Sequence, residues 1–510
     1  MDNSYDVIVI GAGNAGLISA LKLVKENKKV LILESNNVPG GFATSFIRGR
    51  FEFETSLQEI GGYGSSEKIG PIQKLFEKLE ISDKINFINL TDAFHVYAKD
   101  KKEEYRMPFG IQEFINKMNE YVPGSDKAMK KFFILAEEVQ KAIVFLEQDK
   151  NVNSKILSEQ FPNFMKVAAL STDKVFKALK MPKKAAEILS TYWIYLGSPT
   201  SNLSFVHFAS TVLSNLYLGA VIPEKRSHEI SNILAEEITK NGGDIKYLST
   251  VQEILFEEGK VCGVRLSDGK DFKSKHILFN GSPTFLYGKM IPKEYVPKEA
   301  LKLTNSRVLG GRGFSIYLGL NQSPEDIGLT DYSYFINHSL DSNIEFENRS
   351  SIKNNSCVAI VLNNKNPHCS PAGTTLMTMT SVFFGDTFNN KVTEENYFEL
   401  KNQIAENIIN NFEETTGINI KSYIEEIEIA SPVTYARYGG HPEGVIYGYK
   451  LTGLDNLLPR TLNKEKENFV PNVRICGGFD AWGNGFSNTY LSGYRAAKLT
   501  LLDMKGEEEA

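Results

Sequence analysis

A glycine-rich turn between a short apolar strand and a helix limits most strongly what this chain can fold into. Residues 11–16 read Gly-Ala-Gly-Asn-Ala-Gly and match the pattern G-x-G-x-x-G. The apolar run at residues 5–10 predicts a buried parallel strand, and residues 17–26 have the apolar spacing of a helix. A second apolar strand at residues 29–33 ends at Glu34. In this order of strand, turn, helix, strand and acid, the motif predicts a dinucleotide site.

Each glycine of the turn is needed for a different physical reason. Gly11 allows the tight turn, Gly13 lets the backbone approach a pyrophosphate, and Gly16 lets the helix pack on the sheet. Asn14 and Ala15 are expected at the same anion site, because the free N–H groups and the dipole of a helix N-terminus favour negative charge.

The residues after the turn indicate which dinucleotide binds. Glu34 is expected to accept hydrogen bonds from the adenosine ribose hydroxyls, and an acid there disfavours the 2′-phosphate of NADP. A second glycine pair, Gly40-Gly41, follows a few residues later. Such a pair is typical of FAD enzymes of the glutathione reductase and amine oxidase types, and plain NAD dehydrogenases lack it. We therefore expect FAD, with the pair forming a tight turn near its phosphates and ribityl chain.

The C-terminal end of the chain supplies the other half of the expected cofactor site. Residues 473–480 predict a strand that ends in a glycine turn and in Asp480. This acid is expected to hold a ribityl or phosphate-side hydroxyl; the alternative is a helix or turn cap. A helix from about Ser487 would direct its positive end toward the flavin pyrimidine. The other residues expected at the cofactor are Ser35, Phe42, Ala43, Thr44, Val251, Gly281, Gly478, Gly485 and Phe486.

The order of elements predicts an α/β fold, in which a Rossmann-type FAD-binding domain carries an inserted α+β substrate domain. Residues 1–75, 225–285 and 465–510 form the expected FAD-binding domain. The expected substrate domain has a mainly helical part at residues 76–224 and a mixed part of sheet and helix at residues 286–464.

Together these residues resemble the family of phytoene desaturases, carotenoid isomerases and retinol saturases, over most of the chain. The matching segments are residues 39–41 through 53–55, residues 241–245 with Val251 and 261–264, residues 431–434 with 444–448, and residues 485–487 with 492–497. The resemblance implies FAD, a two-domain fold and a long apolar, often polyunsaturated substrate such as a carotenoid or isoprenoid. It also implies chemistry on C=C bonds at the flavin face, by desaturation, saturation or isomerisation.

The chain departs from the family pattern in two segments that the fold would bring near the flavin. The family has Gly, His and Tyr where this chain has Ser56, Gln58 and Glu59. Residues 223–227, Pro-Glu-Lys-Arg-Ser, replace a Pro-x-Gly-Gly-Ser turn. Both departures speak against the ordinary carotenoid reaction.

Glu59 is the candidate acid or base, and Gln58 beside it is a further candidate catalytic residue. A carboxyl group next to an apolar pocket has its pKa raised toward neutrality, which suits proton transfer near pH 7. The alternative is a partly exposed glutamate paired with a lysine or arginine. Tyr447 is the third catalytic candidate. The other residues of its segment that could face the flavin or substrate are Tyr435, Arg437 and His441.

Arg226 and His228 are the candidate substrate-binding residues, because an arginine can hold a substrate carboxylate in bidentate geometry. Such a contact would indicate that the substrate is a fatty acid and not a hydrocarbon. The alternative is a surface or cap-region pair that precedes a helix.

Composition argues against several functions. The net charge is −5, and no basic stripe is present, so nucleic acid is not expected as a partner. The four cysteines lie far apart without C-x-x-C spacing, which predicts free thiols in a reducing cytoplasm and no metal site. Residues 1–4 are too short and too polar for a signal peptide.

The longest run without Asp, Glu, Lys or Arg is residues 188–223. It lies in a region that is predicted to be mainly helical, with one helix at residues 182–195, apart from a hairpin at residues 94–105. The run is interrupted by Pro199 and contains Ser, Thr and Asn, so it does not predict a membrane span. It suits the wall of an apolar tunnel or peripheral contact with a membrane.

Several activities remain open at this point. The first is an FAD-dependent oxidoreductase acting on C=C bonds, and the second is a redox-neutral double-bond isomerase or hydratase of a fatty acid that uses Glu59. Amine oxidation is disfavoured because Phe42 follows the glycine pair where amine oxidases often have arginine, and a non-catalytic flavin or lipid carrier is the last reading. Residues 310–313, Gly-Gly-Arg-Gly, lead into a strand, so no NAD(P)H domain is predicted and electrons would come from an external carrier.

Overall fold

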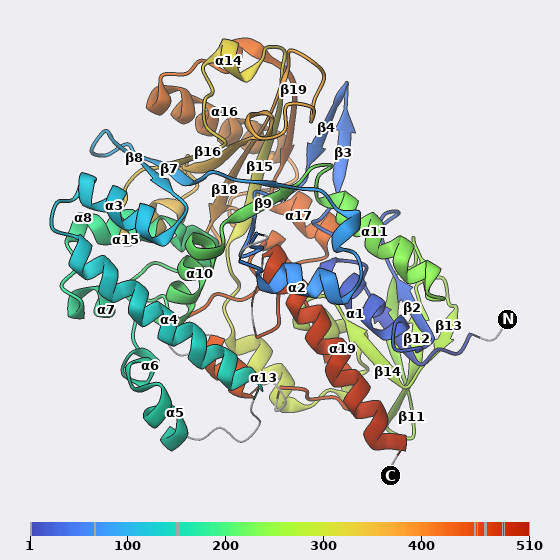
Figure 1. The fold of residues 1–510 in the computed structure, drawn as a ribbon. Helices are drawn as coiled ribbons and strands as arrows, with labels where there is room; N and C mark the ends of the chain where they lie inside the picture. Colours follow the sequence, from blue (N-terminus) through green and yellow to red (C-terminus); the bar gives the residue numbers. More distant parts are fainter. Residues whose placement is uncertain are drawn as a thin grey trace.

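The computed structural model describes residues 3–65, 68–148, 154–452, 455, 457–463, 467–481, 483 and 485–508. Its chain is divided between a parallel sheet with long helices, a larger mixed sheet and a group of helices beside that sheet (Figure 1).

The parallel sheet contains five short strands from distant parts of the sequence. Their order is β10 (Asp244–Lys246), β2 (Val30–Leu33), β1 (Val7–Ile10), β14 (His276–Phe279) and β20 (Val473–Ile475), and all neighbours are parallel. Strands β1, β2 and β14 are buried throughout, because both faces of the sheet are covered.

Alternate side chains of these strands enter two different cores. Val7 and Val9 pack with the helices of one face, which are α1 (Asn14–Val24), α11 (Ser227–Lys240) and α19 (Phe486–Glu508). Ile8 and Ile10 pack with the antiparallel sheet on the other face, which is β11 (Val251–Glu257), β12 (Lys260–Leu266) and β13 (Asp271–Lys273). The predicted strand–turn–helix–strand unit is therefore confirmed, and so is the α/β fold class.

The larger sheet has seven strands. Their order is β19 (Ile424–Ala430), β15 (Arg312–Leu320), β18 (Thr375–Phe383), β17 (Cys357–Val361), β16 (Ser333–Asn337), β7 (Asp92–Ala98) and β8 (Glu103–Pro108). Only β16 and β7 are parallel neighbours among these strands. The hairpin predicted at residues 94–105 is β7 with β8, and the structure adds it to this sheet. Residues 310–313 enter β15, as predicted.

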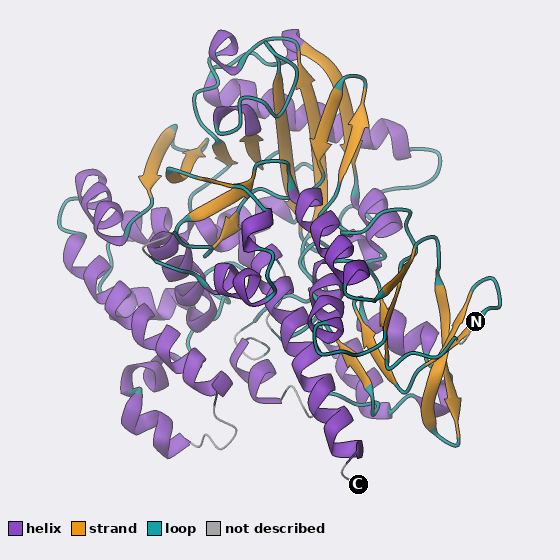
Figure 2. Cartoon of the chain, turned by 45° about the vertical axis from the view of Figure 1, so that its right-hand side comes forward, coloured by secondary structure: helices purple, strands orange, loops and turns teal. Residues whose placement is uncertain are grey.

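Helices cover both faces of the larger sheet (Figure 2). One face packs on α16 (Tyr397–Thr416). The other packs on part of the helical group, whose members are α3 (Ile111–Tyr121), α4 (Asp126–Gln148), α5 (Ser154–Gln160), α6 (Pro162–Val167), α7 (Thr172–Ala178), α8 (Lys183–Leu189), α9 (Trp193–Leu196) and α10 (Phe205–Leu218). The remaining helices are α2 (Pro71–Lys78), α12 (Pro283–Phe285), α13 (Lys298–Ser306), α14 (Pro324–Ile327), α15 (Ser342–Arg349), α17 (Pro432–Gly439) and α18 (Leu457–Asn463).

The uncharged run at residues 188–223 forms part of this helical core. A single helix predicted at residues 182–195 is divided into α8, a 3₁₀ turn (Ser190–Tyr192) and α9. None of the helices in the described ranges is long and apolar enough to cross a membrane.

Two small sheets connect the larger parts. Strands β3 (Ser45–Arg48) and β4 (Phe51–Glu54) form a hairpin. Strand β9 (Ala220–Pro223) pairs with β5 (Ile60–Gly61) and β6 (Phe87–Asn89). Sequence periodicity did not predict either sheet.

The proposed domain limits stay a prediction, and the limit between residues 464 and 465 lies outside the described residues.

Candidate functional site

The glycine turn after β1 leaves no room for side chains. Gly11 has φ +96°, and a Cβ on Gly16 would lie 2.0 Å from the Gly11 carbonyl oxygen. A Cβ on Gly13 would lie 2.7 Å from Nδ2 of Asn280. These approaches let the backbone turn sharply into α1 and bring its amides close to any bound group.

The N-terminus of α1 has no side-chain cap. Gly13 is its N-cap residue, and the first turn contains no acidic residue. The side-chain oxygen of Asn14 is buried, and no described residue donates a hydrogen bond to it. An uncapped helix start with a buried unsatisfied acceptor is a place where a ligand is expected.

Glu34 lies at the end of β2 and turns its carboxylate toward this turn. It is only 5% exposed. One oxygen accepts a hydrogen bond from the amide of Ala12 at 2.6 Å, and the other accepts one from the amide of Asn36 at 2.8 Å. The hydroxyl of Ser35 donates to the same carboxylate at 3.2 Å. The acid is therefore held beside the glycine turn, where ribose hydroxyls can reach it.

The second glycine pair lies against the first motif. Gly40 and Gly41 both have positive φ, +115° and +61°. The amide of Gly40 donates to the carbonyl of Ala12 at 2.8 Å, and Gly40 forms a bridge with Gly13. The structure thus brings the two glycine motifs together, although more than twenty residues separate them.

The C-terminal segment closes the same region from the other side. A Cβ on Gly493 in α19 would lie 2.2 Å from the carbonyl oxygen of Ala15, so α1 and α19 cross in close contact. Nδ2 of Asn14 lies 3.5 Å from Oγ1 of Thr489. The first turns of both helices therefore meet, and their positive ends face a shared region.

Asp480 stabilises the turn that leads to α19. Its carboxylate accepts hydrogen bonds from the Ala481 amide at 2.6 Å and the Ser492 hydroxyl at 2.7 Å. Its predicted contact with a cofactor hydroxyl is not tested by these contacts. The neighbouring Gly478 approaches Gly448, and Gly485 precedes α19 with φ +89°.

The other predicted cofactor residues surround these motifs. Phe42 packs its ring on Tyr435 and His441, with centroids at 5.5 and 5.0 Å. The carbonyls of Ala43 and Thr44 accept hydrogen bonds from Ser231 and Thr55. Val251 starts β11, Gly281 follows β14, and Phe486 begins α19.

Taken together, these residues fit FAD. The turn has amides without competing side chains, an acid at the ribose position, and a second helix start opposite the first. FAD would be held by the turn at residues 11–16, by Glu34, by the pair at residues 40–41, and by Gly478, Asp480 and residues 485–487.

The segment after β4 is fixed by donors from several elements. The hydroxyl of Tyr317 in β15 donates to the Thr55 carbonyl at 2.6 Å, and the hydroxyl of Tyr332 donates to the Gln58 carbonyl. The hydroxyl of Ser487 in α19 donates to the Gly61 carbonyl at 2.8 Å. These bonds place residues 55–61 between the larger sheet and the start of α19.

Glu59 lies in the middle of this fixed segment. No described residue donates a hydrogen bond to its carboxyl group or forms an ion pair with it. Burial raises its pKa to about 8. The side chain nevertheless keeps some accessible surface. Both observations are explained if the carboxyl group faces an internal space rather than bulk solvent.

Three tyrosines lie near enough to Glu59 to be influenced by its charge. Burial raises the pKa of Tyr192, Tyr195 and Tyr332 well above the ordinary value, and the negative charge of Glu59 raises each further. Tyr195 is also close enough to Tyr447 for the two rings to influence each other. We call Glu59, Tyr192, Tyr195, Tyr332 and Tyr447 the tyrosine chamber.

A cavity of about 20 Å³ lies next to the chamber. Gln58 and Glu54 line it together with Thr378 and Thr380 of β18. Gln58 therefore lies at this cavity, next to Glu59 in the chain, and Tyr447 lies near Tyr195. Tyr435 and His441 are held by other groups, since Tyr435 hydrogen-bonds Ser315 and His441 hydrogen-bonds the Val445 carbonyl.

The predicted substrate-binding pair lies at the start of α11 and contacts Glu52. The Arg226 guanidinium donates to Glu52 at 2.9 Å and to the Cys369 carbonyl, and the His228 ring lies 3.7 Å from Glu52. Substrate binding by this pair stays a prediction, but the Arg226 charge is already paired.

The sequence reading missed Glu54 and Tyr332. Glu54 accepts hydrogen bonds from the amide and hydroxyl of Ser227 at 2.8 and 2.6 Å, and so caps α11 from another element. Burial raises its pKa, although these bonds oppose the rise. The sequence near Glu54 and Tyr332 does not indicate these roles, because the partner of each residue is far away in the chain.

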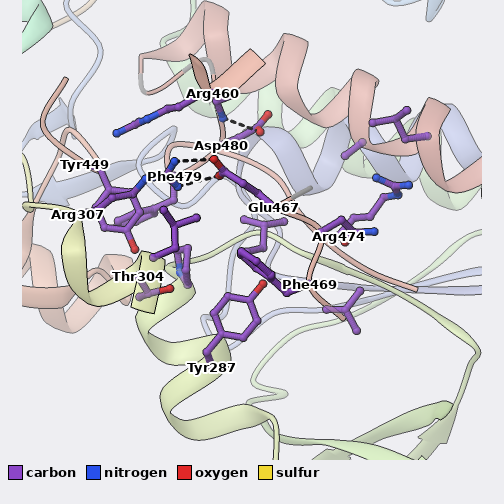
Figure 3. A pocket seen from close by; sticks show the side chains of 18 of the residues that line it. Tyr287, Thr304, Arg307, Tyr449, Arg460, Glu467, Phe469, Arg474, Phe479 and Asp480 are labelled. Atoms are coloured by element: carbon purple, nitrogen blue, oxygen red, sulfur yellow. Dashed lines mark hydrogen bonds and ion pairs between the residues drawn. The ribbon is translucent and has the colours of Figure 1, made fainter. Parts of the chain in front are cut away.

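A larger cavity of about 90 Å³ lies beyond Asp480, between α13, β20 and α19 (Figure 3). Each of the four arginines that line it lies within ion-pair distance of a carboxylate. Arg307 pairs with Glu467 and Asp455, Arg460 with Asp455, Arg474 with Asp503, and Arg495 lies 3.7 Å from Asp480. The cavity is therefore not a free anion site.

The four cysteines, all in described segments, are unpaired thiols, as predicted.

The family comparison covers nearly the whole chain. The model of a family described as flavin containing amine oxidoreductase matches residues 14–501.

Two curated relatives are similar at a lower level. All-trans-retinol 13,14-reductase from Danio rerio is 24% identical over 478 residues, covering 87% of this chain and 77% of the relative. A chloroplastic prolycopene isomerase from Arabidopsis thaliana is 24% identical over 485 residues, covering 89% of this chain and 78% of the relative.

Solved structures share the fold. An oxidoreductase from Methanosarcina mazei superposes with a TM-score of 0.62 at 16% identity, over 97% of this chain and 100% of the other. A putrescine oxidase bound to putrescine superposes with a TM-score of 0.64 at 12% identity, over 98% and 99% of the two chains.

Proposed function

This chain belongs to the family of flavin-containing amine oxidoreductases, and from that premise we propose that it reduces or isomerises C=C bonds in a long apolar polyene. It is an FAD-dependent oxidoreductase or isomerase. Two curated relatives are named as a reductase of all-trans-retinol and as an isomerase of prolycopene, which supports a polyene as the substrate.

The single observation that carries the proposal is the environment of Glu59. Its carboxyl group has no polar partner in the described chain, and burial raises its pKa to about 8. It therefore holds a proton at pH 7 and can act as a general acid. Reduction adds a proton to carbon, and isomerisation through a protonated double bond adds a proton and then removes one. Desaturation instead needs a base that removes a proton.

The chain's residues divide the remaining tasks. Bound FAD supplies two-electron transfer at the substrate carbon. The tyrosine chamber surrounds the substrate with aromatic surface and excludes water, so that the proton of Glu59 is not exchanged with bulk solvent during the step. Tyr332 and Ser487 hold the backbone on either side of Glu59 and thereby position its carboxyl group.

The test is proton delivery to the substrate. In D₂O, the holoenzyme should place deuterium on carbon when it converts retinol or a cis-polyene such as prolycopene. Glu59→Gln should lower this rate at least about 100-fold with FAD still bound. Glu414→Gln, which changes an exposed carboxylate, serves as the control. Equal rates for Glu59→Gln and the unchanged protein would remove the proposal.

The same assay separates reduction from redox-neutral isomerisation. Under anaerobic conditions, pre-reduced enzyme that reduces a double bond becomes permanently oxidised by substrate. Enzyme that isomerises shows turnover with no lasting change in flavin absorbance. Peroxide release with amines, and no reaction with polyenes, would instead support amine oxidation.

For a reductase, we propose an external carrier or diffusing reductant as the electron source. The second glycine-rich stretch supports this, since residues 310–313 enter β15 and not a helix. Because the proposed substrate is apolar, the proposal also includes peripheral contact of the protein with a membrane.

A further inference from the structure

We infer that Lys450 binds a carboxylate at one end of the substrate, so that the substrate class is a long-chain polyunsaturated acid. This inference rests on the proposed function, because it assigns a head group to a chain whose double bond lies near Glu59. It is carried by the surroundings of Lys450 and by the aromatic residues between the two sites.

Lys450 is a half-buried cation for which the described part of the chain supplies no counter-ion. No described carboxylate lies within ion-pair distance of its ammonium group, and no described acceptor is hydrogen-bonded to it. Its nearest recorded partner is the ring of Phe346, whose centroid lies 4.4 Å from Nζ. Burial lowers its pKa, as expected for an ammonium group that has lost water and gained no negative partner.

The surroundings of Arg226 and His228 are different. Arg226 is already paired with Glu52, and the ring of His228 also faces Glu52. A substrate carboxylate at Arg226 would have to displace a carboxylate of the protein. At Lys450 it would meet an unpaired charge.

Aromatic side chains connect Lys450 with the tyrosine chamber. Phe346 stacks on Phe384 with centroids at 4.6 Å, and Trp193 lies 5.9 Å from Phe384. These three rings form an apolar wall beside the lysine. Such a wall suits the methylene carbons that follow a carboxylate.

Two glycines let this wall pack closely against Tyr447 of the chamber. A Cβ on Gly197 would lie 3.5 Å from Tyr447 and 3.9 Å from Phe384. A Cβ on Gly311 would lie 2.3 Å from Val382, 3.1 Å from Phe384 and 3.5 Å from Tyr447. Tyr447 then leads to Tyr195 and Glu59. The rings therefore form a continuous aromatic surface between Lys450 and Glu59, neither of which has an ionic partner among the described residues.

The experiment compares two probes that differ only in the head group. Equilibrium dialysis of the FAD-loaded enzyme measures the dissociation constants of linoleate and of linoleyl alcohol, both below their aggregation limits. We expect the unchanged protein to bind linoleate about tenfold more tightly than the alcohol, since a charge-assisted contact at a partly buried site has about this effect.

Substitutions test whether Lys450 causes the preference for linoleate over linoleyl alcohol. Lys450→Gln should remove it by weakening linoleate alone, and Lys450→Arg should keep most of it. The matched control is Lys289→Gln, because Lys289 also lies over a phenylalanine ring, at 4.9 Å from that of Phe285, but is exposed and remote from the chamber. This control should keep the full preference.

Three results would overturn the inference. They are equal binding of both probes by the unchanged protein, an undiminished preference in Lys450→Gln, and an equal loss of preference in Lys289→Gln. The readout is binding and not turnover. An active Glu59→Gln variant would therefore defeat the proposed proton transfer while leaving the head-group assignment standing.

Discussion

Glu54 and Glu59 are five residues apart, yet the fold gives them different environments. Glu54 receives hydrogen bonds from Ser227 and from the amide of Leu57, and it serves as a cap for α11. Glu59 receives none from the described chain, and burial alone raises its pKa to about 8. A carboxyl group becomes a proton donor near neutral pH because its neighbours are apolar and aromatic, not because of its local sequence.

The raised pKa of Glu59 predicts a pH profile. The protonated form is present well below pH 8 and is lost as the pH rises through about 8. The value of kcat/KM should therefore be level near pH 6 to 7 and fall about tenfold for each pH unit well above 8. Steady-state rates between pH 6 and pH 10 measure it. A profile that rises through pH 8 would mean that Glu59 acts as a base.

The same pKa predicts a stability effect that needs no substrate. An unfolded glutamate has its ordinary pKa of 4.5, whereas burial in the folded state raises the pKa of Glu59 to about 8. The unfolded state therefore binds fewer protons between these values, and stability falls as the pH rises through this window. Glu59→Gln removes this loss, so its Tm advantage over the unchanged protein should be larger at pH 8 than at pH 5. Thermal unfolding at both pH values measures it, and an equal difference at the two would contradict the assignment.

At the level of elements, the crossing of α1 and α19 determines the shape of the cofactor region. Both helices begin there, and the contact between Gly493 and the backbone of Ala15 lets them approach without a side chain between them. Close packing through a glycine is sensitive to a single methyl group. The two helix starts therefore keep their relative positions only while residue 493 is a glycine.

Gly493→Ala should push the two helices apart. Its Cβ would lie 2.2 Å from the Ala15 carbonyl oxygen, so we expect a lower Tm and an FAD affinity reduced at least about tenfold. The matched control is Gly506→Ala in the same helix, where no atom lies within 4 Å of the added methyl group. This control should be neutral or slightly stabilising. Fluorescence titration of the apoprotein with FAD measures the affinity, and equal affinities for both variants would show that the crossing does not matter.

Across the whole molecule, distant parts of the chain meet at the cofactor region. Strands β1, β14 and β20 lie in one sheet although the first and last are more than 460 residues apart. The segment that carries Glu59 contacts the larger sheet through Tyr332 and α19 through Ser487. A ligand in this region therefore stabilises several parts of the fold at once.

Removal of FAD should lower the Tm, and added FAD should restore it. A ligand at about 100 times its dissociation constant stabilises the folded state by about 2.7 kcal/mol. FMN should restore much less, because it lacks the adenosine ribose expected at Glu34 and the second phosphate expected at the turn. Thermal unfolding of the deflavinated protein with each flavin measures this, and equal recovery would contradict the assignment of Glu34.

Much of this fold could be predicted from the sequence because its signals are local. The strand, turn and helix around Gly13 follow from apolar spacing and from the backbone freedom of glycine, and the structure has them as β1, α1 and β2. The sheet of β5, β9 and β6 was missed because its strands are only two to four residues long and pair across more than a hundred residues. The helix at residues 182–195 was predicted as one element because its apolar spacing continues through the 3₁₀ turn.

The sequence by itself determined the cofactor class, since the chemistry of a glycine turn, a helix start and an acid depends on neighbours along the chain. Only the tertiary structure decided which charged side chains are free to react or bind. Arg226 is paired by Glu52 from another element, whereas Glu59 and Lys450 have no described partner. Pairing and burial are set by residues more than a hundred positions away, and they determine whether a charge is neutralised, protonated or available to a substrate.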